Sequence, residues 1–342
     1  MDSVHLTRIR GTLLGTAVGD SIGLPYEGMG PARVAAMAPP RLRQSFVMGR
    51  GMLSDDTEHT FLLGRALAVM EDAGAFEVAL AHALKRWLWT LPGGIGLGTL
   101  RALMRLTVGF GPHRSGVDSA GNGPAMRAAL LGVCLPEPKV ARWVRAATRL
   151  THTDGRAETG ALAVAWMAHG PTVAELVERL PEDDVRQAIL NVREAEDVGE
   201  MVRTLGVERG VSGFVVHTVP AALWVAERAD SFEQAVDMAV RLGGDTDTMA
   251  AIVGALAGAR FGGDAIPDDW LTGIADWPLG VDRLEALARA LSGAGPVPDM
   301  PWLGQLVRNL GVFMPLVLLH GFRRLLPPYG LSAGGRPPST RG

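Results

Sequence analysis

The sequence predicts an all-α protein, a compact bundle of many helices. Over most of its 342 residues, apolar side chains recur at spacings of three and four, the pattern of helices that bury one face. Segments that alternate between apolar and polar residues, as half-buried strands do, are few. Pro136, Pro171, Pro181 and Pro220 stand where these periodic runs begin or end. These observations together favour helix over sheet.

The periodic runs place the expected helices in order along the chain. Two of them follow short acidic runs, at residues 61–70 and from residue 249 onward. The others cover residues 76–90, 124–133, 140–150, 157–169, 173–180, 232–242 and 284–291. A chain of this length that is 47% hydrophobic and 20% charged can bury a large core in one domain.

A change in composition after residue 293 predicts a domain boundary. Residues 1–293 are expected to form the main domain, and residues 294–342 a linker, a C-terminal helix and a disordered tail rich in Gly, Pro, Ser and Arg. The helix, expected at 303–326, should be broken or kinked near Pro315. Three roles are open for this helix: packing on the domain, self-association and contact with a membrane surface. Its apolar stripe favours packing.

Charge and cysteine content narrow the class of protein. The formal net charge is −3 and the isoelectric point is near 6.3, so no basic footprint argues for nucleic acid. The single Cys134 excludes an internal disulfide and suits a reducing compartment. The first residues lack the features of a signal peptide, and the apolar run at 312–319 is too short to span a bilayer and contains a proline. We therefore expect a cytoplasmic protein without a transmembrane segment.

Two short acidic runs carry the strongest functional signal. They are Ser-Asp-Asp-Thr at residues 54–57 and Gly-Asp-Thr-Asp-Thr at residues 244–248, and each precedes an apolar helical run. Ser, Thr and Asp are preferred helix N-caps, so both runs should lie at helix N-termini. Capping alone is the simplest interpretation, but it needs one oxygen for each helix, and each run carries two carboxylates.

Adjacent carboxylates repel one another unless a cation holds them together. Carboxylate and hydroxyl oxygens suit a hard divalent ion such as Mg²⁺, Mn²⁺ or Ca²⁺. If the two runs converge, they supply enough oxygens for two ions that share a bridging carboxylate. The predicted metal ligands are Ser54, Asp55, Asp56, Asp245, Asp247 and Thr248.

The acidic runs and four further segments, in the same order, resemble the ADP-ribosylglycohydrolase family, which includes the dinitrogenase-reductase-activating glycohydrolases. The further segments are residues 15–27, with Gly-Asp and a later Glu, residues 119–127, with Gly-Asn-Gly and Met-Arg, the Thr-His pair at 151–152, and residues 216–223. The resemblance covers roughly residues 5–290. It implies that residues 1–293 form an all-α catalytic domain with a dinuclear metal site.

In this family the metals are usually two Mg²⁺ or Mn²⁺ ions that hold ribose hydroxyls of the substrate. The resemblance makes Asp247 the bridging ligand and Glu27 the catalytic residue. A carboxylate beside two metals can orient a water or transfer a proton, and it can stabilise oxocarbenium-like charge on the ribose. The alternative for Glu27 is a solvated loop residue. Asp20 is expected to have a structural role, as a cap or as the anchor of a turn. Glu58, next to the first acidic run, is an ambiguous candidate for a position around the metal ligands.

Substrate-binding residues are expected in a Gly-rich region, residues 93–123, which we interpret as a ligand loop. This region ends where a helix is expected to begin, at Pro124. The free N–H groups at the start of that helix suit a diphosphate. By resemblance this loop wraps ADP-ribose. Ala120 stands where some relatives have an aromatic residue that stacks on adenine, so Phe214 is considered as a substitute. His152 is expected to donate to phosphate or ribose rather than simply to pack. The predicted set is Ser119, Gly121, Asn122, Gly123 and His152.

The resemblance implies a metal-dependent hydrolase that releases ADP-ribose from an ADP-ribosylated protein or small molecule. ADP-ribosyl-arginine is favoured, because the run at 54–58 resembles glycohydrolases that reverse arginine modification; serine, O-acetyl and non-protein acceptors stay open. Two rivals are an inactive ADP-ribose-binding or structural homologue and a metal-dependent phosphohydrolase that cuts a nucleotide pyrophosphate. Analysis of the products distinguishes the phosphohydrolase, because it would yield AMP rather than ADP-ribose.

Overall fold

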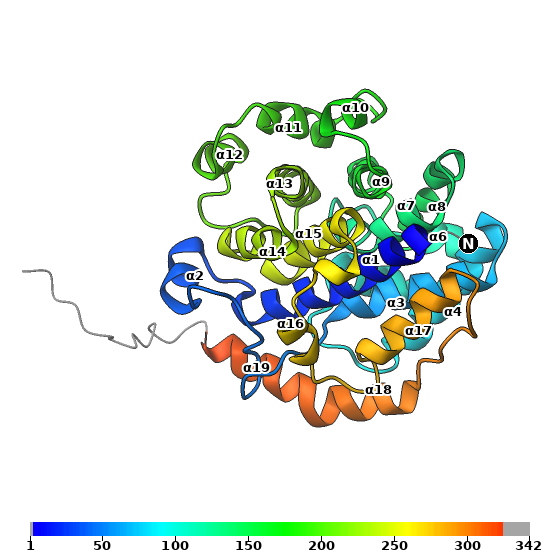
Figure 1. Cartoon of the computed structure of the whole chain (residues 1–342). Coiled ribbons are helices and arrows are strands. Elements are labelled where there is room, and N and C mark those ends of the chain that lie inside the picture. Colours follow the sequence, from blue (N-terminus) through cyan, green and yellow to red (C-terminus); the bar gives the residue numbers. More distant parts are fainter. Residues whose placement is uncertain (1–2, 324–342) are drawn as a thin grey trace, which may run out of the picture.

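The computed structural model describes residues 3–323, and these residues form helices joined by turns and loops (Figure 1). Between residues 3 and 323 there is no β-strand, only isolated bridges between loops. The first half contains α1 (Ser3–Gly23), η1 (Leu24–Tyr26), α2 (Pro31–Met37), α3 (Asp55–Val69), α4 (Ala73–Leu88), α5 (Leu97–Thr107), α6 (Pro112–Ser115), η2 (Ala125–Arg127), α7 (Ala129–Cys134), α8 (Glu137–Arg149) and α9 (Gly155–His169). The expectation of an all-α protein is confirmed.

The second half continues the helical pattern. It contains α10 (Val173–Val177), α11 (Asp184–Arg193), α12 (Val198–Leu205), α13 (Val215–Arg228), α14 (Phe232–Arg241), α15 (Thr246–Phe261), η3 (Gly263–Ala265), α16 (Asp268–Thr272), α17 (Val281–Leu291), α18 (Trp302–Arg308), a π-helical turn, η4 (Asn309–Phe313), and α19 (Met314–Arg323).

Two antiparallel helices, α1 and α15, form the centre of the molecule. Glycines of α1 recur every fourth residue and lie against the backbone of α15; a Cβ atom at Gly15 would lie 2.1 Å from the Gly254 carbonyl oxygen, and one at Gly19 only 1.9 Å from that of Ala250. Only glycine allows the two backbones to come this close. The close packing places the end of α1 beside the start of α15.

The remaining helices pack around this pair. Helices α3, α7 and α17 contact α1, while α9, α13 and α14 contact α15. In Figure 1, α9–α14 lie on one side of the pair, and α3, α4 and α17 lie on the other. One continuous core of buried apolar residues runs through both groups. Because α3 and α15 are both fixed against α1, their N-termini are held near each other.

Two expectations about the loops are wrong in detail. Residues 93–123 are not one ligand loop, because α5 and α6 lie within them. The helix expected at 124–133 is divided at Ala128 into the short η2 turn and α7. A 3-10 turn of three residues therefore follows the Gly-Asn-Gly segment, and the extended helix N-terminus expected for a diphosphate is absent there.

The C-terminal helix is irregular near Pro315, as the sequence predicts. The π-helical turn, residues 309–313, lies directly before Pro315. Proline has no N–H and its ring crowds the carbonyl four residues earlier, and a wider turn accommodates both effects. The helix packs on the domain through its buried Arg308 and Asn309. The expected end of this helix at 326 and the expected disordered tail fall on residues outside the described part.

Candidate functional site

The two acidic runs begin α3 and α15, as expected. Ser54 is the N-cap of α3, and its Oγ accepts a hydrogen bond of 3.3 Å from the backbone N–H of Asp56. Asp245 occupies the corresponding position before α15 but makes no side-chain cap. The carboxylate of Asp245 is therefore not used to cap its helix.

The two runs meet at the carboxylate of Asp56. Its Oδ2 accepts hydrogen bonds from Ser54 Oγ at 3.1 Å and from Thr248 Oγ1 at 3.2 Å. Asp56 and Asp247 are both buried, with 1% and 6% of their surface exposed. The structure thus brings together residues that the sequence separates widely.

Asp20 fixes the start of α3 from the last turn of α1. Its Oδ2 accepts hydrogen bonds from the backbone N–H groups of Ser54 (2.9 Å) and Thr57 (3.2 Å) and from the Thr57 hydroxyl (2.5 Å). This agrees with the expected capping role. Burial raises the pKa of Asp20 to about 6, although these hydrogen bonds oppose the rise.

Negative charge accumulates at this site. Burial, and then the neighbouring carboxylates, raise the pKa values of Asp55, Asp56 and Asp247 well above the usual range. Burial also raises the pKa of Asp245, against a hydrogen bond from Asn122. The surroundings disfavour the charged form of each carboxylate. A cation bound among these carboxylates would therefore be strongly stabilised.

Unpartnered oxygens indicate where a cation would fit. Oδ1 of Asp20, Asp56 and Asp247 is buried and has no hydrogen-bond partner within the described residues. Buried polar atoms are normally satisfied, and hard oxygen atoms of this kind suit Mg²⁺ or Mn²⁺. No three Asp, Glu, His or Cys side chains in the described part converge closely enough to hold an ion by themselves. The hydroxyls of Ser54 and Thr248 are therefore needed to complete such a site.

Glu27 lies beside the second acidic run. Backbone hydrogen bonds join Gly28 N to Gly244 O at 2.6 Å and Gly244 N to Met29 O at 2.7 Å. Glu27 is half-buried, and its charge contributes to the raised pKa values of Asp55 and Asp247. Its position at the edge of the acidic site is compatible with a catalytic role, which remains a prediction.

Asn122 contacts the acidic site directly. Its Nδ2 donates to Asp245 Oδ2 at 2.7 Å, and its backbone N–H donates to Gly213 O at 3.0 Å. The sequence assigned Asn122 to the substrate, whereas its side chain here orients a predicted metal ligand. Whether it also touches the substrate stays a prediction.

The other predicted substrate-binding residues gather around His152. A Cβ atom at Gly98 would lie 2.9 Å from both His152 Nε2 and Ser119 Oγ, and Cβ atoms at Gly121 and Gly123 would also approach the imidazole. His152 is 3% exposed, so its imidazole packs directly against glycine backbone, and a side chain at Gly98 would collide with it. Gly98, which lies in the Gly-rich region and at the start of α5, is one of the glycines that contact His152.

A buried polar chain sets the state of His152. Its Nδ1 lies 2.9 Å from Thr151 Oγ1, which accepts a hydrogen bond of 2.9 Å from Arg127 Nη2. Burial, and then the charge of Arg127, lower the pKa of His152 to about 3, so it is neutral at pH 7. The Thr151 hydroxyl has two acceptors within reach, the Thr148 carbonyl at 3.4 Å and His152 Nδ1 at 2.9 Å. We assign its hydrogen to the nearer Nδ1, which places the imidazole proton on Nε2, facing the glycines.

Phe214 lies next to the position where an aromatic residue is missing. The Phe214 segment pairs with the loop through Val215 N to Ala120 O at 2.9 Å. The guanidinium carbon of Arg156 lies 5.5 Å from the Phe214 ring centre. This placement keeps Phe214 as the predicted aromatic partner for adenine.

The sequence did not reveal the connection between the site and the C-terminal helix. Glu58 follows the first acidic run and accepts hydrogen bonds from Trp87 Nε1, Gln305 Nε2 and Arg308 Nη1. Burial raises its pKa to about 7, against the opposing charge of Arg308. Glu58 therefore faces the C-terminal helix, and no pattern in the sequence predicted this pairing.

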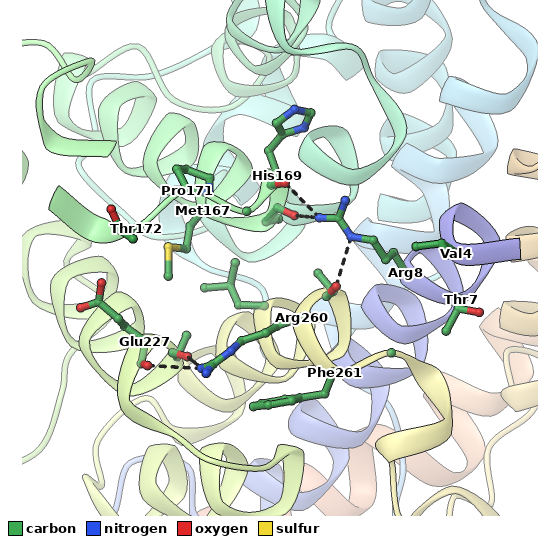
Figure 2. Close-up of a pocket in the computed structure, with 16 residues that line it drawn as sticks. Val4, Thr7, Arg8, Met167, His169, Pro171, Thr172, Glu227, Arg260 and Phe261 are labelled. Carbon is green, nitrogen blue, oxygen red and sulfur yellow. Dashed lines mark hydrogen bonds between the residues drawn. The ribbon is translucent and has the colours of Figure 1, made fainter. Parts of the chain in front are cut away.

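A cleft of about 700 Å³ lies at the opposite end of α1 and α15 (Figure 2). Its arginines bind carbonyl groups at helix ends: Arg8 binds those of Ala168 and His169, and Arg260 binds that of Ala226. None of the predicted site residues lines it. We therefore place the functional site at the carboxylates, where the unpartnered oxygens lie.

Comparison with known proteins identifies the family to which this chain belongs. Residues 1–299 match the family described as ADP-ribosylglycohydrolase. The chain is 29% identical to the ADP-ribosyl-[dinitrogen reductase] glycohydrolase of Rhodospirillum rubrum, over 79% of this chain and 90% of that protein. It is 28% identical to the ADP-ribosylarginine hydrolase Tri1 of Pseudomonas putida, over 86% and 80%.

A solved structure shows the same architecture. The chain in an ADP-ribosylglycohydrolase-related protein complex aligns with a TM-score of 0.66 and 28% identity, over 86% of this chain and all of that one. The helical fold matches what the sequence resemblance implied. This chain therefore belongs to the ADP-ribosylglycohydrolase family and is an enzyme that hydrolyses a glycosidic bond of ADP-ribose.

Proposed function

We propose that this enzyme is a dinuclear-metal hydrolase that releases ADP-ribose from arginine residues of modified proteins. The observation that carries the proposal is the meeting of the two acidic runs at Asp56, with unpartnered carboxylate oxygens on Asp56 and Asp247. Two Mg²⁺ or Mn²⁺ ions would supply positive charge there, to hold ribose hydroxyls and stabilise charge developing in the reaction.

The residues that would hold the ions come from both helix N-termini. Asp247 is assigned the bridging role that the family resemblance implies, and its buried, unpartnered Oδ1 supports the assignment. The full set is Ser54, Asp55, Asp56, Asp245, Asp247 and Thr248. Asn122 supports this set by donating to Asp245.

Glu27 is the proposed catalytic residue. In the hydrolysis a water oxygen bonds to the anomeric carbon of the ribose, and the bond from that carbon to the acceptor nitrogen breaks. Glu27 would accept one proton from this water and return it to the departing nitrogen, so that free arginine and ADP-ribose result. Its position beside residues 243–245 supports this role.

Substrate positioning is assigned to the surface around His152. The neutral imidazole would donate from Nε2 to a ribose or phosphate oxygen. Ser119, Gly121 and Gly123 surround the same space, and Phe214 is next to it in the paired segment. Their grouping supports a site for the diphosphate and adenosine part of the ligand.

Arginine is the favoured acceptor because one relative is named an ADP-ribosylarginine hydrolase. The test is incubation with ADP-ribosyl-arginine, ADP-ribosyl-serine and O-acetyl-ADP-ribose, with Mg²⁺ or Mn²⁺ and with a chelator. We expect ADP-ribose to be released fastest from ADP-ribosyl-arginine and only with metal. Faster release from another substrate would refute the arginine assignment. Activity that persists in metal-free protein would refute metal dependence, and AMP as product would point to pyrophosphate cleavage.

A further inference from the structure

The C-terminal helix, α18 to α19, has its polar side chains inside and its apolar side chains outside. The outer face consists of side chains that are between 41 and 64% exposed: Trp302, Leu303, Val307, Leu310, Val312, Leu318 and Leu319. A surface helix normally has the reverse arrangement. In Figure 1 this helix runs along the edge of the molecule, with no other element outside it. An exposed apolar surface of this kind marks a contact with a partner.

The inner face fixes the helix to the catalytic domain. Arg308 Nη2 lies 2.5 Å from Asp276 Oδ2, and Arg308 Nη1 lies 3.3 Å from Glu58 Oε1. Asn309 Nδ2 donates to the Thr90 carbonyl at 2.9 Å. Residues 302–321 are long and apolar enough to cross a membrane by length and composition alone. Crossing would strip the partners from Arg308 and Glu58 and place Arg308 in hydrocarbon, so the helix is built to lie flat.

Further apolar side chains widen the outer face at both ends. Met48, 99% exposed, stands at the tip of a tight turn whose Phe46 ring stacks on His320 at 4.3 Å. Trp277 is also exposed and lies against Gly304, where a Cβ atom would come within 2.9 Å of the indole. The apolar surface is therefore broader than one helix.

Positive charge flanks this surface. Near Trp302, a small cavity is lined by Arg65, His82 and Arg86. Burial, and the charges of Arg86 and Arg283, lower the pKa of Arg65 against the opposing charge of Asp299, with which Arg65 pairs at 3.1 Å. After Asp299 the sequence contains no acidic residue, and besides the buried Arg308 it contains Arg323, Arg324, Arg336 and Arg341. These four charges leave −7 on the rest of a chain whose net charge is −3.

We propose that the outer face docks on an anionic lipid bilayer, with the helix lying in the interface. An apolar helix face with basic residues at its ends is the arrangement that binds anionic lipid. A second copy is disfavoured as the occupant because it would bring like-charged arginines together. The family match ends at residue 299, so the helix at the centre of this surface lies outside the matched residues, and the surface holds the enzyme at a membrane.

The test is flotation of the full-length protein with vesicles of phosphatidylcholine alone or mixed with phosphatidylglycerol. We expect binding to the anionic vesicles, weakened by salt, and little binding to the neutral ones. Val307→Glu/Leu310→Glu should lower the bound fraction by about tenfold or more, because two apolar contacts are replaced by repelled charges. Both side chains are exposed, so the melting temperature should not fall.

The matched control is Val108→Glu/Val198→Glu, which adds the same charges at exposed apolar sites after α5 and at the start of α12. It should float like the wild type. Equal binding by the Val307→Glu/Leu310→Glu variant, or no binding to anionic vesicles, would overturn the proposal. A dimer that this variant dissociates, without vesicle binding, would assign the face to a second copy. Resistance of bound protein to alkaline carbonate would show a spanning helix instead.

Discussion

Thr248 Oγ1 donates a hydrogen bond to Asp56 Oδ2 over 3.2 Å, and these two residues are 192 positions apart in the sequence. Each belongs to the first turn of a helix, α15 and α3, and both helices pack on α1. The glycine-mediated contact between α1 and α15 therefore determines where the carboxylates meet. The chemistry of the site depends on how closely these backbones approach.

Packing between α1 and α15 should be sensitive to a single methyl group. Gly15→Ala places a Cβ atom 2.1 Å from the Gly254 carbonyl oxygen, so the helices must separate. We expect a loss of about 1–3 kcal/mol or more in the free energy of unfolding, measured by urea denaturation. The control is Gly155→Ala, since nothing lies within 4 Å of a Cβ there. Equal stability of the two variants would contradict the close contact.

Glu27→Gln should separate chemistry from binding. If Glu27 transfers a proton, kcat should fall by roughly 10²–10⁴-fold, while calorimetric affinity for ADP-ribose changes little. Exposed Glu178→Gln is the matched control and should retain wild-type activity. Near-normal turnover by Glu27→Gln would make this carboxylate a loop residue without a role in catalysis.

His152→Ala should show the opposite effect. Removal of the imidazole takes away a donor facing Gly98 and Gly121, so the Kd for ADP-ribose should rise more than kcat falls. Titration calorimetry and single-turnover rates measure the two effects separately. Unchanged ADP-ribose affinity would place His152 outside the binding site.

The pH dependence of stability should reflect the burial of His152. Its pKa of about 3 in the folded state is below the ordinary value of 6.5, so the unfolded chain binds more protons between these pH values. The free energy of unfolding should therefore decrease as the pH falls below 6.5, by up to about 2 kcal/mol at pH 5 from this residue. His152→Gln should remove that part of the dependence. Identical pH profiles for the wild type and His152→Gln in urea denaturation would contradict a buried, neutral histidine.

Arg308 should contribute strongly to stability through a helix outside the family match. Arg308→Ala leaves Glu58 and Asp276 buried without their cation, and loss of one partner of a buried pair costs roughly 3–5 kcal/mol. Urea denaturation measures this. Arg41→Ala removes two ion pairs at the surface, with Glu233 and Asp269, and should change stability far less. Similar losses for both variants would show that the C-terminal helix is only loosely attached.

The sequence predicted much of the fold because local patterns decide it. Apolar periodicity located most helices, and Ser and Asp before apolar runs located the starts of α3 and α15. The glycines of α1 gave no such signal, since glycine alone does not reveal which backbone it faces. The pairing of Gly15 with Gly254 is visible only when the two helices are seen together.

Tertiary context explains what the sequence could not predict about the site. The resemblance assigns Asn122 to the substrate, and nothing in the sequence indicates that its side chain also donates to Asp245. The helix expected from Pro124 ends after one 3-10 turn, a boundary that propensity does not mark. Arg308 lies in an apolar run, and nothing local shows that its partners are Glu58 and Asp276.

The most direct test of the proposed dinuclear site is the number of metal ions bound by the wild type and by Asp247→Asn. This substitution preserves size and removes the buried charge assigned to the bridging ligand. Asp268→Asn, at an exposed position on α16, controls for the loss of one charge. Titration of the metal-free proteins with Mn²⁺ should give two ions per chain for the wild type and for Asp268→Asn, and fewer than two for Asp247→Asn. A wild type that binds no Mn²⁺, or an Asp247→Asn variant that still binds two ions, would contradict a metal site built from the two acidic runs.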